Sequence, residues 1–522
     1  MYHLGLISLS FIDTAIIAIY VAVIIGIAWR VRRGQNTQED YFLGGRRIFW
    51  PLVAVSTFAT LFSTITFVTV PAEAYGNGIL LACGSFLFLP LLPVAINTVL
   101  RKFFDRPTLT SYEYLQVRFN SAVRTMGALY FLFARLLYTC VVLYAASKIF
   151  TEIFGVSIYG TIAIIGVATI IYTMIGGMRA VVFTDFIQSL MLLVGVGAIL
   201  WVISAGIGFD WVTPWAALIE EDPRYGLAPL FDADMLHIGY QDRINLLLII
   251  YPMLAMPFMM VSADQLVVQR LLSTKGFKQA KRSMYVSAGL GVMVAMLVWL
   301  IGVGLVLYFR QNPAPTQLAP GDALGYFISE HLPSPIPGLL CAAMLAMIMS
   351  TIDSTINSLS AVLEVDIISR LRRGTKANLN ESRLVSLGWG LLAVCVALAV
   401  AYRGESGGLP IFELAAVLAS GWGIVTASFV LGMLTKWVTA KAMTIGFAAG
   451  LVTTVAVQAQ YLALPPETRM SFSYTPIIPT FATLAVAMVL SLLRGRKHRG
   501  ARSEGQWRAD PEPSQVFAGE RR

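Results

Sequence analysis

The chain has 522 residues, of which 57% are hydrophobic and only 13% charged. Soluble domains carry about 25% charged residues, so no soluble arrangement offers enough interior for this many apolar side chains. Intrinsic disorder is excluded too, because it requires low hydrophobicity and high charge. The net charge of +9 could indicate a nucleic-acid partner. Its distribution along the chain must be examined before it is interpreted. The composition predicts a polytopic membrane protein.

Thirteen apolar segments are long enough to cross about 30 Å of hydrocarbon, which takes roughly 20 residues. In chain order they are 11–29, 51–71, 79–100, 123–150, 158–175, 183–207, 244–261, 284–308, 336–365, 385–402, 412–434, 442–460 and 475–493. The first lacks a basic start and a cleavage site, so we expect a retained helix and not a signal peptide.

The basic residues between these segments predict their orientation. Alternate loops and the tail hold 31 of the Lys and Arg residues, and the opposite side holds five. Cytoplasmic loops are the positive ones, so the N-terminus should lie outside and the C-terminus inside a plasma (inner) membrane. The +9 therefore reflects topology, and a nucleic-acid partner loses its motivation. Residues 494–522 read as a disordered cytoplasmic tail whose basic start suits anionic headgroups.

The second segment is unusually rich in hydroxyl groups. They belong to Ser56, Thr57, Thr60, Ser63, Thr64, Thr66 and Thr69. Hydroxyls often bond back to their own helix, but the cluster between Phe62 and Thr66 favours a helix unwound inside the membrane. Such backbone must line a cavity or pack inside the protein.

The seventh segment carries Pro252 and Pro257, each of which removes a helical hydrogen bond. A simple kink is the alternative interpretation. However, segments two and seven are five helices apart, and paired interrupted helices in inverted halves indicate the binding site of a secondary transporter.

The ninth segment has a polar face in which Ser350, Ser354 and Asn357 follow helical spacing and Thr351 and Asp353 widen the stripe. An aspartate costs about 2.5–3.5 kcal/mol at the centre of an inserting helix, so it should have a partner. Oxygen ligands without His or Cys suit a hard cation such as Na+. A polar seam between helices is the alternative.

Three further charged residues are candidates. Asp185 lies at the start of the sixth segment, where capping of the helix is the first interpretation. Apart from Arg124 at the very start of segment 123–150, Arg135 and Lys148 are the only cations that fall within a predicted segment. Lys148 can extend its amine towards the interface, whereas Arg135 could bind a carboxylate through two parallel hydrogen bonds or serve a structural partner.

Six stretches together resemble the sodium/solute symporter family. They are Asp40-Tyr-Phe-Leu-Gly-Gly-Arg46, Pro71-Ala-Glu-Ala-Tyr75, Thr110-Ser-Tyr-Glu-Tyr-Leu-Gln-Val-Arg-Phe119, Tyr172-Thr-Met-Ile-Gly-Gly-Met-Arg-Ala-Val-Val-Phe-Thr-Asp185, Gln265-Leu-Val-Val-Gln-Arg270 and Ser350-Thr-Ile-Asp-Ser354. The resemblance covers about residues 11–493, and it is greatest to the iodide, multivitamin and monocarboxylate symporters and to bacterial sialic acid symporters.

This resemblance implies an all-α LeuT-type fold with a 5+5 inverted repeat. The implied parts are an extra helix and loop (1–50), a first repeat (51–207), an extracellular loop (208–243), a second repeat (244–434), two peripheral helices (435–493) and the tail (494–522).

The resemblance also implies two sodium sites. The site shared in the family maps to carbonyls of Ala59, Phe62 and Met347 with hydroxyls of Ser350 and Thr351. A second site, present in part of the family, maps to Asp185, Ser350, Asp353 and Ser354. Asp353 stands where some members carry a smaller hydroxyl residue, so this second site departs from the pattern of those members.

Substrate positions map less directly. They are Ser63, Thr66, Ser85, Arg135, Tyr138 and Pro257. The arginine of the sialic acid symporters falls at Tyr138, one turn after Arg135. Pro257 stands where sugar-transporting members carry an amide, so a sugar is not expected.

The sequence therefore predicts Na+-coupled symport of a small organic anion by alternating access, with the monomer sufficient. A neutral solute, an inorganic anion and proton coupling through Asp353 or Asp185 remain alternatives. A channel or sensor fits less well, and no nucleophile–base set of an enzyme is found.

Overall fold

All regular structure in the described part of the chain is helical. The computed structural model describes residues 10–32, 35–105, 108–226, 246–314, 318–372, 378–404, 421–465, 468–471 and 474–495. Within these ranges nine helices are long and apolar enough to cross a membrane, and two bent helix pairs raise the number to eleven. The all-α membrane fold is confirmed at this level. Residues 227–243, 412–420 and 496–522 of the predicted loop, eleventh segment and tail lie outside the described residues.

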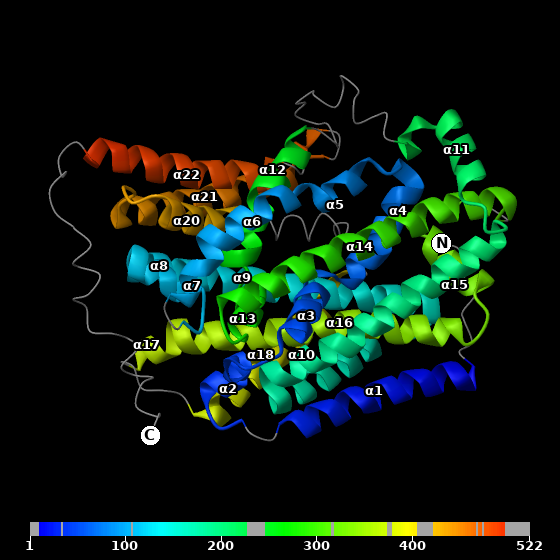
Figure 1. The fold of residues 1–522 in the computed structure, drawn as a ribbon, viewed down its shortest axis with the longest axis horizontal. Coiled ribbons are helices and arrows are strands. Elements are labelled where there is room, and N and C mark those ends of the chain that lie inside the picture. Colours follow the sequence, from blue (N-terminus) through cyan, green and yellow to red (C-terminus); the bar gives the residue numbers. More distant parts are fainter. Residues whose placement is uncertain are drawn as a thin grey trace.

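One helix runs through the middle of the molecule. Figure 1 shows α16 (Ile336–Val362) between α1 (Phe11–Val31) at one edge and the pair α21 (Ala440–Ala463) and α22 (Tyr474–Gly495) at the opposite edge. The most apolar stretch of the α16 span is 89% buried, against 22% for α1. Since α16 carries the predicted ion ligands, those side chains lie in the protein interior.

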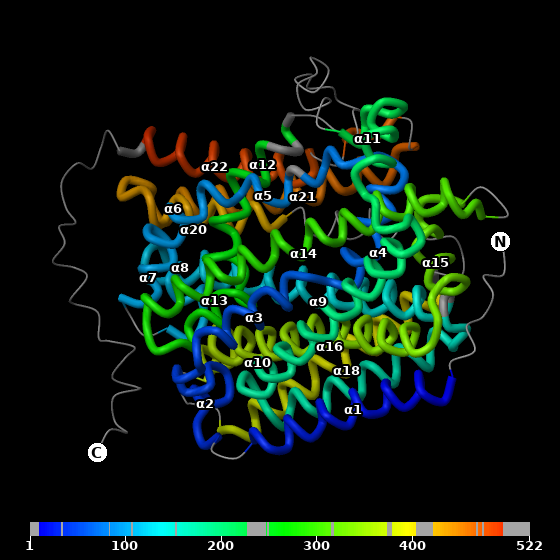
Figure 2. The backbone as a smooth tube through the Cα atoms, turned by 45° about the vertical axis from the view of Figure 1, so that its right-hand side comes forward, coloured from blue at the N-terminus to red at the C-terminus, as the bar shows by residue number. Residues whose placement is uncertain are grey.

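The remaining long helices pack around α16. They are α9 (Ser121–Phe154), α10 (Ile158–Gly206), α14 (Phe277–Gln311), α18 (Leu379–Gly404) and the shorter α20 (Trp422–Leu434). Short helices lie at the two ends of this bundle, α11 (Val212–Glu221) and α15 (Ala323–His331) at one and α2 (Gln38–Leu43) and α8 (Tyr112–Arg118) at the other. The tube in Figure 2 shows the same layering from a second direction.

The second predicted segment is a broken helix, as its hydroxyl cluster indicated. Helices α3 (Trp50–Leu61) and α4 (Thr64–Asn77) meet at 61°. Phe62 has extended backbone (φ −101°, ψ 113°), and the Ser63 hydroxyl caps α4 by accepting from the Thr66 amide. The alternative interpretation also holds in part, because Thr57, Thr60 and Thr69 do bond back to carbonyls of their own helix.

The seventh predicted segment is also broken, but not at its prolines. Helix α12 (Leu246–Phe258) contains Pro252 and Pro257 and continues as one π-helical turn, η8 (Met259–Ala263). The chain then bends by 55° into α13 (Gln265–Leu272). The break is at Asp264, whose extended backbone (φ −81°, ψ 97°) and carboxylate cap α13. The prediction of an interrupted helix is confirmed, whereas its position was wrong.

Helix α10 joins two predicted segments without a loop. Its 49 residues would measure about 74 Å at 1.5 Å per residue, more than twice the hydrocarbon thickness. The helix is interrupted at Gly177, where φ is +52° and a Cβ atom would lie 2.7 Å from the Tyr41 carbonyl oxygen. Glycine is needed here because other residues are strained at positive φ.

Candidate functional site

The break between α3 and α4 lies beside the middle of α16. The Thr60 and Ser354 hydroxyls are 3.3 Å apart, and the Thr64 hydroxyl lies 3.5 Å from the Met344 carbonyl. The order of these contacts shows that α3–α4 and α16 run in opposite directions past each other, so Phe62 falls between the levels of Met344 and Ser354. Carbonyls at the end of a helix lack helical partners, so this break offers oxygen atoms to a ligand.

The hydroxyl groups of α16 have different partners, and that of Ser354 meets Thr60 beside the break. Thr351 donates to the Met347 carbonyl at 3.0 Å, and Ser350 donates to an oxygen of Asp185 at 2.5 Å. Ser350 and Thr351 are at most 2% exposed. Asn357 instead accepts from Gln269 at 2.7 Å, so it belongs to a polar seam between helices, the alternative stated above.

Asp185 is an interior residue and not a helix cap. The only non-helical residue of α10 is Gly177, eight residues before Asp185. Asp185 therefore lies inside the second half of this helix, and it is completely buried. One of its carboxylate oxygens accepts from Ser350, and the other accepts from Ser56 at 2.5 Å. The capping interpretation was wrong because the apparent loop before the sixth segment is helical.

Arg270 is the partner of Asp185, and sequence reasoning missed it. Its Nη2 atom lies 3.2 Å from Asp185, and both side chains have no exposed surface. The guanidinium also donates to Ser56, Ser354 and the Leu266 carbonyl. Arg270 had been assigned to a cytoplasmic loop, since the apolar run ends at 261. The sequence feature that could have revealed it is the motif from Gln265 to Arg270, one of the six stretches that resemble the family. All residues of this motif are fully buried.

Asp353 completes the cluster. It accepts from Tyr172 at 2.6 Å and from Ser354 at 3.0 Å. Tyr172 and Asp185 are 13 residues apart on α10, yet they bond to residues of α16 only one turn apart, because the chain turns back at Gly177. All four residues of the predicted second ion site are therefore brought together, with Arg270 among them.

The first helix forms a wall of this cluster. Gln188 donates to the Tyr20 hydroxyl at 3.2 Å, and that hydroxyl lies 3.7 Å from the sulfur of Met349. Tyr20 is 4% exposed. Helix α1 thus contacts residues that neighbour both Asp185 and Ser350.

The predicted substrate residues fall into two groups. Ser63 and Thr66 share a hydroxyl contact of 3.1 Å at the break. Tyr138 on α9 packs against a small apolar cluster formed by Ile65 of α4 with Val142 and Ala145 of α9. The Arg135 guanidinium lies over the rings of Tyr138 and Trp422, at 5.3 and 5.9 Å. Ser85 on α5 (Gly84–Leu87) and Pro257 lie on two helices that pack together, and no described hydrogen bond links them to the first group.

Arg135 faces the second broken helix. Its Nη2 atom is 3.7 Å from the Asp264 carboxylate, and both residues are less than 9% exposed. Its Nε atom is buried without a hydrogen-bond partner. Lys148, the other cation within a predicted segment, is exposed on α9.

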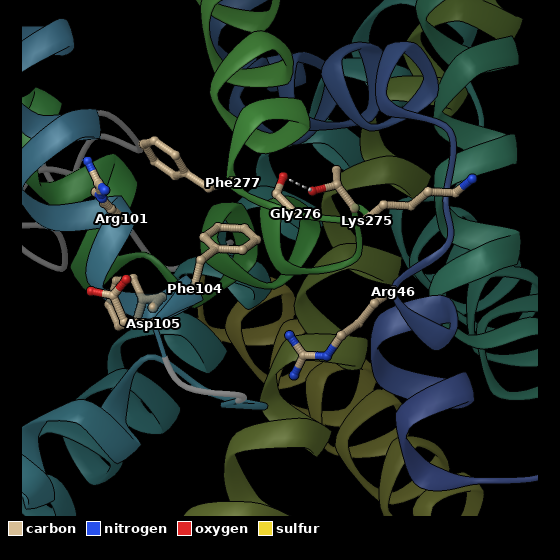
Figure 3. A pocket seen from close by; sticks show the side chains of 9 residues that line it. Arg46, Arg101, Phe104, Asp105, Lys275, Gly276 and Phe277 are labelled. Atoms are coloured by element: carbon tan, nitrogen blue, oxygen red, sulfur yellow. Dashed lines mark hydrogen bonds between the residues drawn. The ribbon is translucent and has the colours of Figure 1, made fainter. Parts of the chain in front are cut away.

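A separate pocket of about 590 Å³ lies away from these residues. It is lined by Arg46, Arg101, Phe103, Phe104, Asp105, Thr274, Lys275, Gly276 and Phe277. Figure 3 shows the Lys275 side chain pointing away from Phe277. None of the lining residues belongs to the predicted sites.

Two broken helices beside a buried polar cluster define a secondary transporter of the type with discontinuous membrane helices. Residues 41–450 match the profile of the sodium:solute symporter family. The chain belongs to this family, as the sequence motifs indicated, and the family consists of transporters and not enzymes.

Individual relatives agree with this assignment. The sodium/sialic acid symporter SiaT of Proteus mirabilis (strain HI4320) is 28% identical over 464 residues, covering 86% of this chain and 90% of that protein. The human sodium/iodide cotransporter is 29% identical, with 91% and 73% covered. The solved structure of a substrate-bound, outward-open Na+-coupled sialic acid symporter superposes with a TM-score of 0.81 at 26% identity, covering 93% of this chain and 98% of that one.

Proposed function

We propose that this protein couples Na+ entry to uptake of a small organic anion by alternating access. The anion is a carboxylate such as a sialic acid, a monocarboxylate or a vitamin. The observation that carries the substrate class is Arg135, a buried guanidinium that has an unbonded Nε atom and lies over the Tyr138 ring. A substrate carboxylate could accept two parallel, charge-assisted hydrogen bonds from this guanidinium.

The proposed architecture is a LeuT-type bundle of thirteen spans. Residues 51–207 and 244–434 form the inverted repeats, with the N-terminus outside and the C-terminus inside an inner membrane. The shared Na+ site uses carbonyls of Ala59, Phe62 and Met347 with the hydroxyls of Ser350 and Thr351. The contacts of Thr60 with Ser354 and of Thr64 with Met344 lie on both sides of Phe62, Met347, Ser350 and Thr351, which supports this ligand set.

A second Na+ site is proposed at Asp185, Ser350, Asp353 and Ser354. Two carboxylates and one guanidinium carry one excess negative charge when all are ionised, which favours a monovalent cation. Arg270 already bonds to Asp185 and Ser354, so Na+ must compete with it. We expect this second site to be weaker than the shared one.

The coupling follows from position. Sodium at the shared site ties the α3–α4 break to α16 and stabilises the form that receives substrate at Ser63, Thr66, Arg135 and Tyr138. Each positive charge moved inward gains about 2.3 kcal/mol per 100 mV. Since one chain supplies every proposed ligand, the monomer suffices.

The test is uptake into proteoliposomes, with Na+ or choline outside, of radiolabelled sialic acid, lactate, biotin, iodide, proline and glucose. We expect Na+-dependent uptake of one of the carboxylates, and its loss in Ser350→Ala and in Thr351→Ala. Thr355→Ala is the matched control, because Thr355 bonds only to its own helix. Uptake of a neutral solute alone, or uptake unaffected by either variant, would contradict the substrate class or the site, respectively.

A further inference from the structure

Arg135 differs from the other buried arginines in how few of its donors are used. Arg270 donates to two hydroxyls, a carboxylate and a carbonyl. Arg124 donates to Asp366, Gln116 and the Val365 carbonyl. Among the described residues, the polar partner of the Arg135 guanidinium is Asp264 at 3.7 Å, a distance that exceeds hydrogen-bond length. A guanidinium has five N–H donors, so Arg135 can donate further hydrogen bonds to a ligand.

The Asp264 carboxylate divides its two oxygens between two tasks. Oδ1 accepts from the Leu266 amide at 3.0 Å and caps α13. Oδ2 is the atom that faces Arg135. The capping bond can therefore persist when the contact with Arg135 changes.

A carboxylate at this distance neutralises Arg135 without saturating it. Two buried opposite charges attract each other strongly, so the pair lowers the cost of keeping the guanidinium inside the empty protein. A substrate carboxylate can offer shorter, paired hydrogen bonds to the same guanidinium. The two carboxylates then compete for one cation.

We propose that Asp264 is a built-in competitor, which occupies Arg135 in the empty transporter and is displaced by the anionic group of the substrate. The inference rests on the proposed function, since it takes Arg135 as the anion receptor. Asp264 would then be a specificity-determining residue. An anion must bind the Arg135 guanidinium more strongly than Asp264 does, so anions that form weak hydrogen bonds are rejected.

Displacement of Asp264 from Arg135 would also affect the cluster of Asp185, Asp353 and Arg270. Asp264 and Arg270 stand at the two ends of less than two turns of α13. Release of Asp264 from α9 removes one tie between α9 and the helix that holds Arg270 against Asp185. Binding of the anion is thus transmitted to the cation cluster through one short helix.

The test removes the charge of Asp264 and keeps the cap. Asparagine is as good a helix cap as aspartate, so Asp264→Asn isolates the electrostatic role, and Asp264→Ser is a second capping variant in case the first fails to fold. The probe is acetate, titrated against purified protein at constant ionic strength. The dissociation constant comes from the rise of the thermal unfolding midpoint.

We expect Asp264→Asn to bind acetate at least tenfold more tightly than the unmodified protein, and Arg135→Met/Asp264→Asn to lose saturable binding. Asp222→Asn is the matched control, because Asp222 also caps a helical turn and pairs with an arginine, Arg224 at 2.6 Å. Unchanged or weaker acetate binding in both Asp264 variants overturns the inference. If Arg135→Met abolishes carboxylate uptake in that case, the proposed function still stands.

Discussion

Arg270 and Arg135 are both buried beside a broken helix, and their surroundings are opposite. Arg270 has no exposed surface, and its Nε and both Nη atoms donate to oxygen. Arg135 faces two aromatic rings and one distant carboxylate. A satisfied buried charge holds elements together, whereas an unsatisfied one is available to a ligand. We therefore expect Arg270 to stabilise the fold and Arg135 to bind a ligand.

The largest effect should come from Arg270→Met. Removal of the cation leaves Asp185 and Asp353 buried together, and breaking a buried ion pair in this way costs about 3–5 kcal/mol. We expect a strongly lowered unfolding temperature or failure to accumulate in the membrane. Thermal unfolding of purified protein followed by tryptophan fluorescence measures this. Arg270→Lys should recover part of the loss, and full stability of the Met variant would show that Arg270 is not scaffold.

Arg135→Met should reverse this pattern. The Met side chain fills similar volume between the rings, and Asp264 retains its bond to the Leu266 amide, so we expect the unfolding temperature to change much less than in Arg270→Met. Truncating one partner of a buried charge pair with a ligand costs about 2–5 kcal/mol in binding. Carboxylate uptake should thus fall at least 30-fold, while stabilisation by Na+ alone persists. Loss of both properties would place Arg135 in the scaffold.

Asp353→Ser should have the smallest effect. It leaves one carboxylate and one guanidinium in the cluster, so the charges balance, and Tyr172 can still donate to the Met349 carbonyl at 3.2 Å. We expect unchanged stability and a rise of up to tenfold, or about 1.4 kcal/mol, in the Na+ concentration for half-maximal uptake. Measurement of uptake against Na+ concentration gives this value. An unchanged Na+ dependence would remove Asp353 from the cation site.

Hydropathy could predict where helices run, but not how the broken ones continue. The second segment was found with its break, because the hydroxyl residues around Ser63 compete locally for backbone bonds. In the seventh, the prolines suggested a break too early, since both fit within α12. Asp264 and the whole of α13 followed the apolar run and were therefore assigned to the loop.

The charge count misplaced Arg270 for the same reason. The count treats each cation beyond an apolar run as a loop residue. Arg270 instead lies in the protein interior on α13, where it pairs with Asp185. Pairing of Asp185 with Arg270 depends on three elements far apart in the chain, and no local pattern specifies that. The candidate ligands themselves, Ser350 and Asp353, could be predicted since a polar stripe on an apolar helix is a local signal.

The contact of Tyr20 with Gln188 and Met349 has a practical consequence for engineering. Helix α1 precedes the first of the two proposed repeats, so it is a natural part to remove when a minimal transporter is sought. Without it, the sides of Gln188 and Met349 that now meet Tyr20 would face lipid, one turn from Asp185 and next to Ser350. A shortened protein would need a replacement for this one tyrosine before it could keep its ions apart from the bilayer.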